Sequence, residues 1–161
     1  MKSEDRELLL KDLCARLPYG VKVSVNGGEE PWTLKGMFEG EHTGMMLILE
    51  PSFSSKDVSP QTSNWQLSQC KPYLRPLSSM TEEEKRILQS FYPMSFGNQY
   101  LDLDKETIEL YECNSTMEFY LDDSVQMVDF CKKNHLDCYG LIKKDLAIEV
   151  TEDNNPYRVE L

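Results

Sequence analysis

The chain has 161 residues, of which 28 are acidic and 17 basic, with five cysteines and an apolar fraction of 40%. That length fits one ordinary domain or two small modules, and the apolar fraction is too high for a disordered chain. The longest apolar run, residues 45–49, is too short to cross a bilayer, which excludes a membrane-spanning helix.

The N-terminus and the cysteines both indicate a cytoplasmic protein. Residues 1–7 are mostly charged and no long apolar stretch follows them, so the pattern is not that of a secretory signal. The cysteines, at positions 14, 70, 113, 131 and 138, are too sparse for a secreted disulfide scaffold. We expect reduced thiols.

Negative charge is concentrated in the last third of the chain. Residues 1–100 carry 13 acidic and 11 basic side chains, whereas residues 101–161 carry 15 and 6, a net charge of −9. A surface of that sign repels phosphate backbones, which disfavours direct nucleic-acid binding, and it is also a common route to solubility.

The chain opens with a predicted helix over residues 3–17. Ser3 is placed to cap this helix, and acidic residues in the first turn suit the positive end of the helix dipole. Apolar side chains at helical spacing predict one buried stripe, made of Leu9, Leu10, Leu13, Cys14 and Leu17.

Residues 21–68 are typical of short strands. Strands are predicted over 21–25, 32–38, 45–49 and 65–68, with a turn at Asn26-Gly27-Gly28 and a loop over 53–63. Strands this short and this close together favour a small curled β-sheet or an SH3-like barrel flanked by helices, in a protein of α+β class.

The second half is predicted to be a smaller α+β part. The capping box that begins at Thr81 starts a helix that ends before Pro93. Further predicted elements are a loop at 96–99, short strands over 100–103 and 107–111, and either a strand or the start of a helix over 117–121, of which the strand is favoured. They are followed by a helix capped by Asp122 or Asp123, a short helix or turn-plus-strand over 141–148, and a loose tail from 151. We expect two modules, residues 1–80 and the acidic residues 81–161, packed as one unit.

Cys131, His135 and Cys138, with Cys113 upstream, are candidate zinc ligands. Thiolates and imidazole are preferred by zinc, and Cys131 and His135 would share a helical face at i, i+4. A Cys–His nucleophile is the other chemical interpretation, with His42 as a further candidate, but a cysteine within a helix offers no oxyanion hole. Because free cysteine is often buried and no Cys-x-x-Cys pair occurs, we predict core packing, with no metal and no cofactor.

Three aromatic residues of the β-rich part, Trp32, Trp65 and Tyr73, are the candidate binding residues. In small sheets and barrels such residues either fill the interior or line a groove for an extended peptide. Core filling is the simpler interpretation, and a groove is the binding surface that the sequence best supports.

Three segments carry a resemblance to a known family. They are DLCARLPYGV at 12–21, KPYLRPLSSMT at 71–81 and NHLDCYGLI at 134–142. Together they resemble an uncharacterised family of short proteins from Bacteroides-type gut bacteria, often encoded in phage-like or mobile regions. The resemblance implies a cytoplasmic protein in a mobile-element context and supplies no catalytic residues.

These observations favour a non-enzymatic adaptor that presents a groove or an edge strand to a protein partner. Two alternatives stay open. One is an acidic decoy that mimics nucleic acid through the net charge of −9, and the other is a small Cys- or metal-dependent enzyme.

Overall fold

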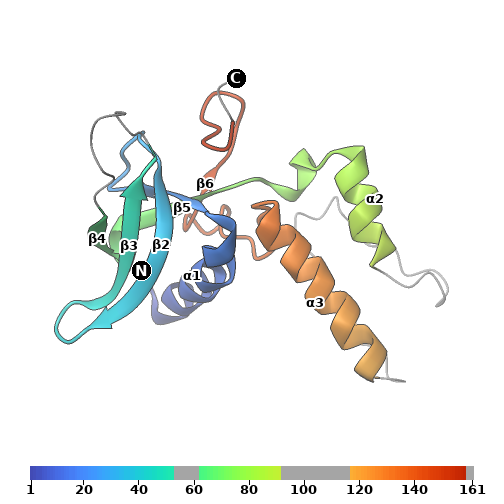
Figure 1. Ribbon diagram of the computed structural model, residues 1–161, viewed down its shortest axis with the longest axis horizontal. Coiled ribbons are helices and arrows are strands. Elements are labelled where there is room, and N and C mark those ends of the chain that lie inside the picture. The colour runs from blue at the N-terminus through green and yellow to red at the C-terminus, as the bar shows by residue number, and fades with distance from the viewer. Residues whose placement is uncertain (53–61, 92–116, 159–161) are drawn as a thin grey trace. The chain divides into compact units, whose positions relative to one another are not determined.

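The computed structural model describes residues 1–52, 62–91 and 117–158, and these combine helices with a β-sheet (Figure 1). The predicted α+β class is confirmed. The chain forms two compact units, residues 1–74 with 141–161 and residues 75–140. The two-module prediction, 1–80 and 81–161, stays a prediction. The predictions for 53–61, 96–99, 100–103 and 107–111, and Cys113, lie outside the described residues.

The first unit contains a six-stranded sheet in the order β4-β3-β2-β1-β5-β6. Every described pairing is antiparallel except β5 with β6, which is parallel. The strands are β1 (Lys22–Val25), β2 (Trp32–Gly40), β3 (Gly44–Pro51), β4 (Ser63–Gln66), β5 (Cys70–Leu74) and β6 (Ile148–Glu149). The described strands form an open sheet, with β4 and β6 at its edges, so an SH3-like barrel is not confirmed.

The predicted strands 21–25, 32–38 and 45–49 are confirmed as β1, β2 and β3. The fourth is β4, after which the chain turns into the 3-10 helix η2 (Leu67–Gln69). The sequence signal missed β5, because Pro72 within Cys70–Leu74 is unfavourable in a strand. Residues 141–147 form turns before β6, which confirms the turn-plus-strand alternative.

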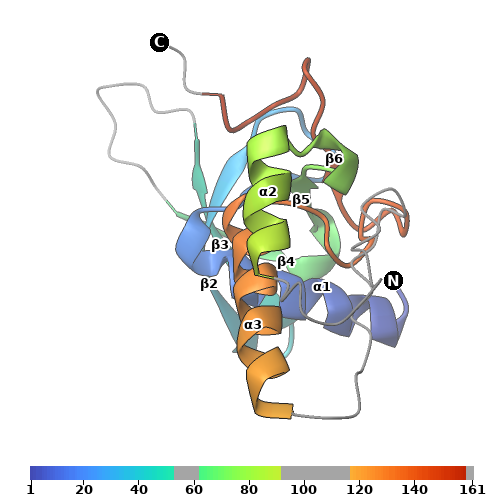
Figure 2. The same cartoon turned by 90° about the vertical axis from the view of Figure 1, so that its right-hand side faces the viewer.

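One face of this sheet forms the core. Neighbours along a strand alternate between faces, so Leu47 and Leu49 of β3 lie on the same side. Their partners on β2, Met37 and Leu34, lie on that side too, because the register shifts by one residue at a bulge between Leu34 and Gly36. Leu34, Leu47 and Leu49 are all almost fully buried. Helix α1 (Ser3–Arg16) runs beside the sheet (Figures 1 and 2), followed by the 3-10 helix η1 (Leu17–Tyr19).

The buried stripe of α1 contains an ion pair that the apolar pattern does not reveal. Leu9 and Leu13 are buried as predicted, but the stripe continues through Asp12 and Arg16, while Cys14 is exposed. Arg16 donates from Nε and Nη2 to the two carboxylate oxygens of Asp12, at 2.7 and 3.1 Å, and both side chains are fully buried. Bidentate pairing compensates part of the large cost of burying these charges. The predicted Ser3 cap is wrong, because the N-cap residue is Lys2, without a side-chain cap hydrogen bond.

The hydroxyl of Tyr157 completes the ladder between β1 and β5. The described register ends at Val23–Pro72, and the next pair along the strands is Lys22 with Tyr73. The Lys22 N–H donates to the Tyr157 hydroxyl oxygen at 3.2 Å, and that hydroxyl donates to the Tyr73 carbonyl at 2.8 Å. The predicted loose tail from residue 151 is therefore wrong for 151–158, because Tyr157 fastens it to the sheet.

The second unit pairs helices α2 (Glu82–Ser90) and α3 (Met117–Lys133), which run side by side (Figures 1 and 2). They enclose an apolar cluster of Leu77, Met80, Leu88, Met127, Cys131, Leu136 and Cys138. Of the two alternatives for 117–121, the favoured strand is wrong and the helix start is confirmed, because α3 begins at Met117. Asp122 and Asp123 lie inside α3 and cannot cap it.

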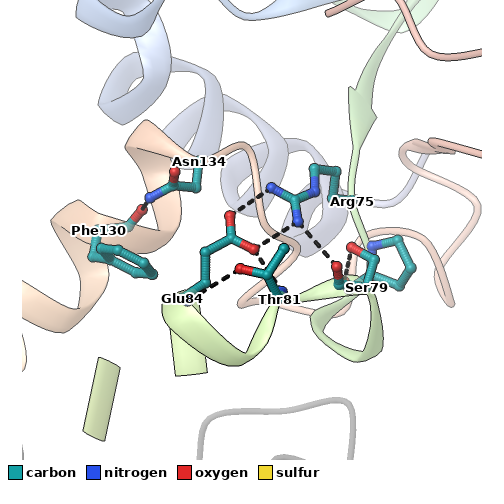
Figure 3. Close-up of polar contacts among 7 residues, drawn as sticks. Arg75, Ser79, Thr81, Glu84, Phe130 and Asn134 are labelled. Carbon is teal, nitrogen blue, oxygen red and sulfur yellow. Dashed lines mark hydrogen bonds and ion pairs between the residues drawn. The ribbon is translucent and has the colours of Figure 1, made fainter. Parts of the chain in front are cut away.

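Arg75 connects the parts of the second unit (Figure 3). Its guanidinium donates to both carboxylate oxygens of Glu84, at 2.8 and 2.9 Å, and to the Ser79 carbonyl, at 3.0 Å, in the 3-10 helix η3 (Leu77–Ser79). Its backbone also accepts from the Asp137 N–H and donates to the His135 carbonyl, both at 2.8 Å. One residue thus joins the start of α2 to the chain that follows α3.

The predicted capping box is confirmed. The Thr81 hydroxyl accepts from the Glu84 N–H at 3.2 Å, and the Glu84 carboxylate accepts from the Thr81 N–H at 2.8 Å. The hydrogen bond from Arg75, followed by the capping bonds, holds the pKa of Glu84 below its ordinary value although burial raises it.

We expect Tyr157→Phe to lower the free energy of unfolding by about 1–3 kcal/mol, because a part-buried N–H and a carbonyl lose their shared partner. Chemical denaturation measures the loss. Tyr73→Phe is the matched control, since its hydroxyl lies 3.5 Å from the Glu29 carbonyl, too far for a strong hydrogen bond. Equal losses in the two variants would contradict the assigned role of Tyr157.

We expect acid to destabilise the second unit through Glu84. A carboxyl group whose folded pKa is depressed stabilises the fold above its unfolded pKa, here the ordinary value of 4.5, and loses that contribution as the pH falls through the folded pKa. Glu84→Gln should therefore flatten the fall of Tm between about pH 5 and pH 3, measured by circular dichroism. Glu83→Gln, an exposed neighbour, should leave the slope of the wild type unchanged. A Glu84→Gln variant with the wild-type slope would refute this role.

Candidate binding pocket

A cavity of about 630 Å³ lies in the first unit, over the end of the sheet where β5 meets β6. Tyr73 pairs with Ile148 in the register of these strands, so their side chains share one face and form the floor. The remaining lining comes from the turn after β1 and from the tail: Gly27, Gly28, Glu29, Pro31, Asp153, Asn154, Asn155 and Pro156.

The turn after β1 is a preformed wall of this pocket. Asn26 and Gly27 both adopt positive φ, at 51° and 71°, as the predicted Asn-Gly turn requires. The Gly28 N–H donates to the Val25 carbonyl at 2.9 Å, and the buried Ser24 hydroxyl donates to the Gly28 carbonyl at 2.9 Å. The backbone of this wall is therefore fixed before any ligand arrives.

The tail forms the opposite wall and is held by its own asparagines. Asn154 accepts from the Thr151 N–H at 2.7 Å and donates to the Glu149 carbonyl at 2.9 Å, and Asn155 accepts from the Tyr157 N–H at 3.0 Å. Burial, as the largest cause, raises the pKa of Tyr157, so its hydroxyl stays a hydrogen-bond donor at neutral pH. The positive charge of Arg16 and the hydrogen bond from Lys22 oppose that rise.

The charged side chains that line the pocket are all acidic. Glu29 comes from the turn and Asp153 from the tail, and both are exposed. No lysine, arginine or histidine lines it among the described residues. The pocket therefore suits a ligand that brings positive charge or hydrogen-bond donors.

The three aromatic candidates do not form one groove. Trp32 and Trp65 lie on the core side of the sheet with their ring centroids 6.2 Å apart, edge to face. Val23 pairs with both Trp32 and Pro72, so Tyr73, the residue after Pro72, lies on the opposite face. Of the three predicted binding residues, Tyr73 alone lines the pocket.

The spacing of Cys131 and His135 reflects a helix end. Helix α3 stops at Lys133, and His135 has a left-handed φ of 55°. The Leu136 N–H donates to the Cys131 carbonyl at 2.9 Å and the His135 N–H to the Lys132 carbonyl at 3.2 Å, which together make a Schellman motif. The expectation that Cys131 and His135 share a helical face is wrong.

The described residues hold no group of three His, Cys, Asp or Glu side chains arranged to bind a metal ion. Cys131 and Cys138 belong to the apolar cluster of the second unit, as predicted. Burial raises the pKa of Cys70 to about 12, which makes it a poor nucleophile at neutral pH. His42 is exposed in the turn between β2 and β3.

Sequence reasoning missed most of the pocket. Its floor and walls come from residues 27–29, 31, 73, 148 and 153–156, which are distant in the chain, and the tail carried no periodic signal. The Asn-rich stretch before Tyr157 was the available indication, because asparagines often close local turns.

No helix within the described ranges is both long and apolar enough to span a membrane.

Comparison of the chain with protein-family models, with curated proteins and with solved structures finds no match. The function must therefore be argued from the geometry of the pocket.

We expect Cys14 to be alkylated in the folded protein, because its side chain is exposed, whereas Cys70, Cys131 and Cys138 are buried. Iodoacetamide at about pH 8, followed by peptide mass spectrometry, gives the order of reaction. Denaturant should abolish the difference between the four sites. Rapid modification of Cys131 in the native protein would instead indicate an activated thiol.

Proposed function

We propose that this chain is a non-enzymatic adaptor that holds an extended segment of a protein partner in the pocket above Tyr73 and Ile148. The cavity carries the proposal: at about 630 Å³ it falls within the roughly 300–1,000 Å³ of typical ligand pockets. Its floor is made by the partly exposed Ile148 and by Tyr73, which is 5% exposed, while its walls supply polar groups. That combination suits a peptide, which presents apolar stems together with polar backbone.

A pocket is better supported than strand addition at the β6 edge. β6 has only two residues, and the Glu149 carbonyl already accepts a hydrogen bond from Asn154. A partner strand that added to this edge would have to displace the tail that forms the pocket wall. Binding in the groove is therefore better supported than binding at the edge strand.

The cytoplasmic location and the mobile-element context are part of this proposal and rest on the family resemblance alone. The acidic decoy is a separate candidate, supported by the net charge of −9 in residues 101–161. A decoy would bind through many distributed charges, so its binding would not depend on filling one pocket.

Selection from a random peptide library displayed on phage, against the immobilised full chain, tests the adaptor proposal. We expect a shared sequence to be enriched, and the corresponding synthetic peptide to bind in isothermal titration. Ile148→Trp should weaken that binding at least tenfold, or about 1.4 kcal/mol, because the indole fills the floor of the pocket.

Ile87→Trp is the matched control, because Ile87 is 37% exposed on α2 in the other unit. It should bind the selected peptide like the wild type. No enrichment above an unrelated acidic protein, or equal binding by the Ile148→Trp variant, would refute the proposed function.

A further inference from the structure

Building on the proposed function, we infer that the pocket recognises a lysine or arginine side chain of the partner segment, held between Glu29 and Asp153. The two carboxylates belong to opposite walls, one in the turn after β1 and one in the tail. A cation bound in this pocket would therefore have acidic residues from two separate segments in its lining.

No cationic side chain of the described residues forms an ion pair with either carboxylate. Elsewhere even exposed carboxylates have cationic partners. Lys71 Nζ lies 2.6 Å from Asp145 Oδ1, and Lys85 Nζ lies 2.8 Å from Glu82 Oε1. Within the part of the chain that the structure describes, the charge of Glu29 and Asp153 is available to a group from outside.

The floor of the pocket suits the same ligand. Ile148 is partly exposed and contributes an aliphatic surface, against which the stem of a lysine or arginine packs while its charged end meets the carboxylates, and Tyr73, 5% exposed, supports this surface from the core.

The surroundings favour attraction of a basic segment. Glu30, Glu149 and Glu152 are exposed neighbours of the lining residues in sequence and add negative charge next to the pocket. Both walls are fixed by hydrogen bonds in the free chain, so little ordering is needed on binding. Charge and preorganisation thus point to the same kind of partner.

The peptides enriched in the phage-display selection also test this inference, because their sequences show whether a basic residue recurs at a fixed position. We expect one, and we expect its replacement by Met to weaken binding about tenfold, which corresponds to one charge-assisted contact. The variant Glu29→Gln/Asp153→Asn should bind the basic peptide more weakly than the wild type by a similar factor, and should bind the Met peptide as the wild type does. Such a double-mutant cycle assigns the contact to these carboxylates.

The matched control is Glu30→Gln/Glu152→Gln, which removes the same charge one residue away from each lining carboxylate. Its affinity for the basic peptide should fall less than threefold, which corresponds to about 0.7 kcal/mol, because only the long-range electrostatic field changes. An equal loss in both double variants would overturn the inference in favour of general attraction. Selected peptides without a fixed basic residue would overturn it while leaving the adaptor function intact, whereas no selected peptide at all would overturn both.

Discussion

The pocket of the first unit depends on one hydroxyl group. At the end of β1 and β5, Tyr157 provides the hydrogen bonds that the next rung of the ladder would otherwise make, accepting from Lys22 and donating to Tyr73. Tyr73 is thus fixed through its backbone by the same residue that fastens the tail, while its side chain forms the pocket floor. Floor and wall are therefore parts of one hydrogen-bonded assembly.

Each of the two units contains an arginine–carboxylate pair joined by two hydrogen bonds. Arg16 pairs with Asp12 inside the buried stripe of α1, and Arg75 pairs with Glu84 where α2 begins. The two pairs differ in environment: the first is fully buried, and the second keeps part of its surface exposed. Removing one partner is costlier in the first, because it strands an unpaired charge in the core.

Local patterns predicted local structure well. Alternating valines, the Asn-Gly turn and the Thr81 capping box each specify a hydrogen-bonding pattern within a few residues, and each is confirmed. Predictions failed where distant contacts decide. The aromatic residues near Met117 favour a strand by propensity, yet that segment is the start of α3, and Asp12 and Arg16 look like solvent-facing charges although they pair in the core. One failure is local: Cys131 and His135 look like a ligand pair on one helical face, although α3 ends between them in a Schellman motif.

The pocket shows why composition alone is a poor guide to binding in so acidic a chain. Glu29 and Glu30 are adjacent and chemically alike, as are Glu152 and Asp153, yet in each pair one residue lines the cavity and the other does not. The difference arises from the Asn-Gly turn and the asparagine-held tail, which set the direction of each wall. Recognition of a basic side chain is therefore a property of where two carboxylates are placed, and a net charge of −11 conceals it.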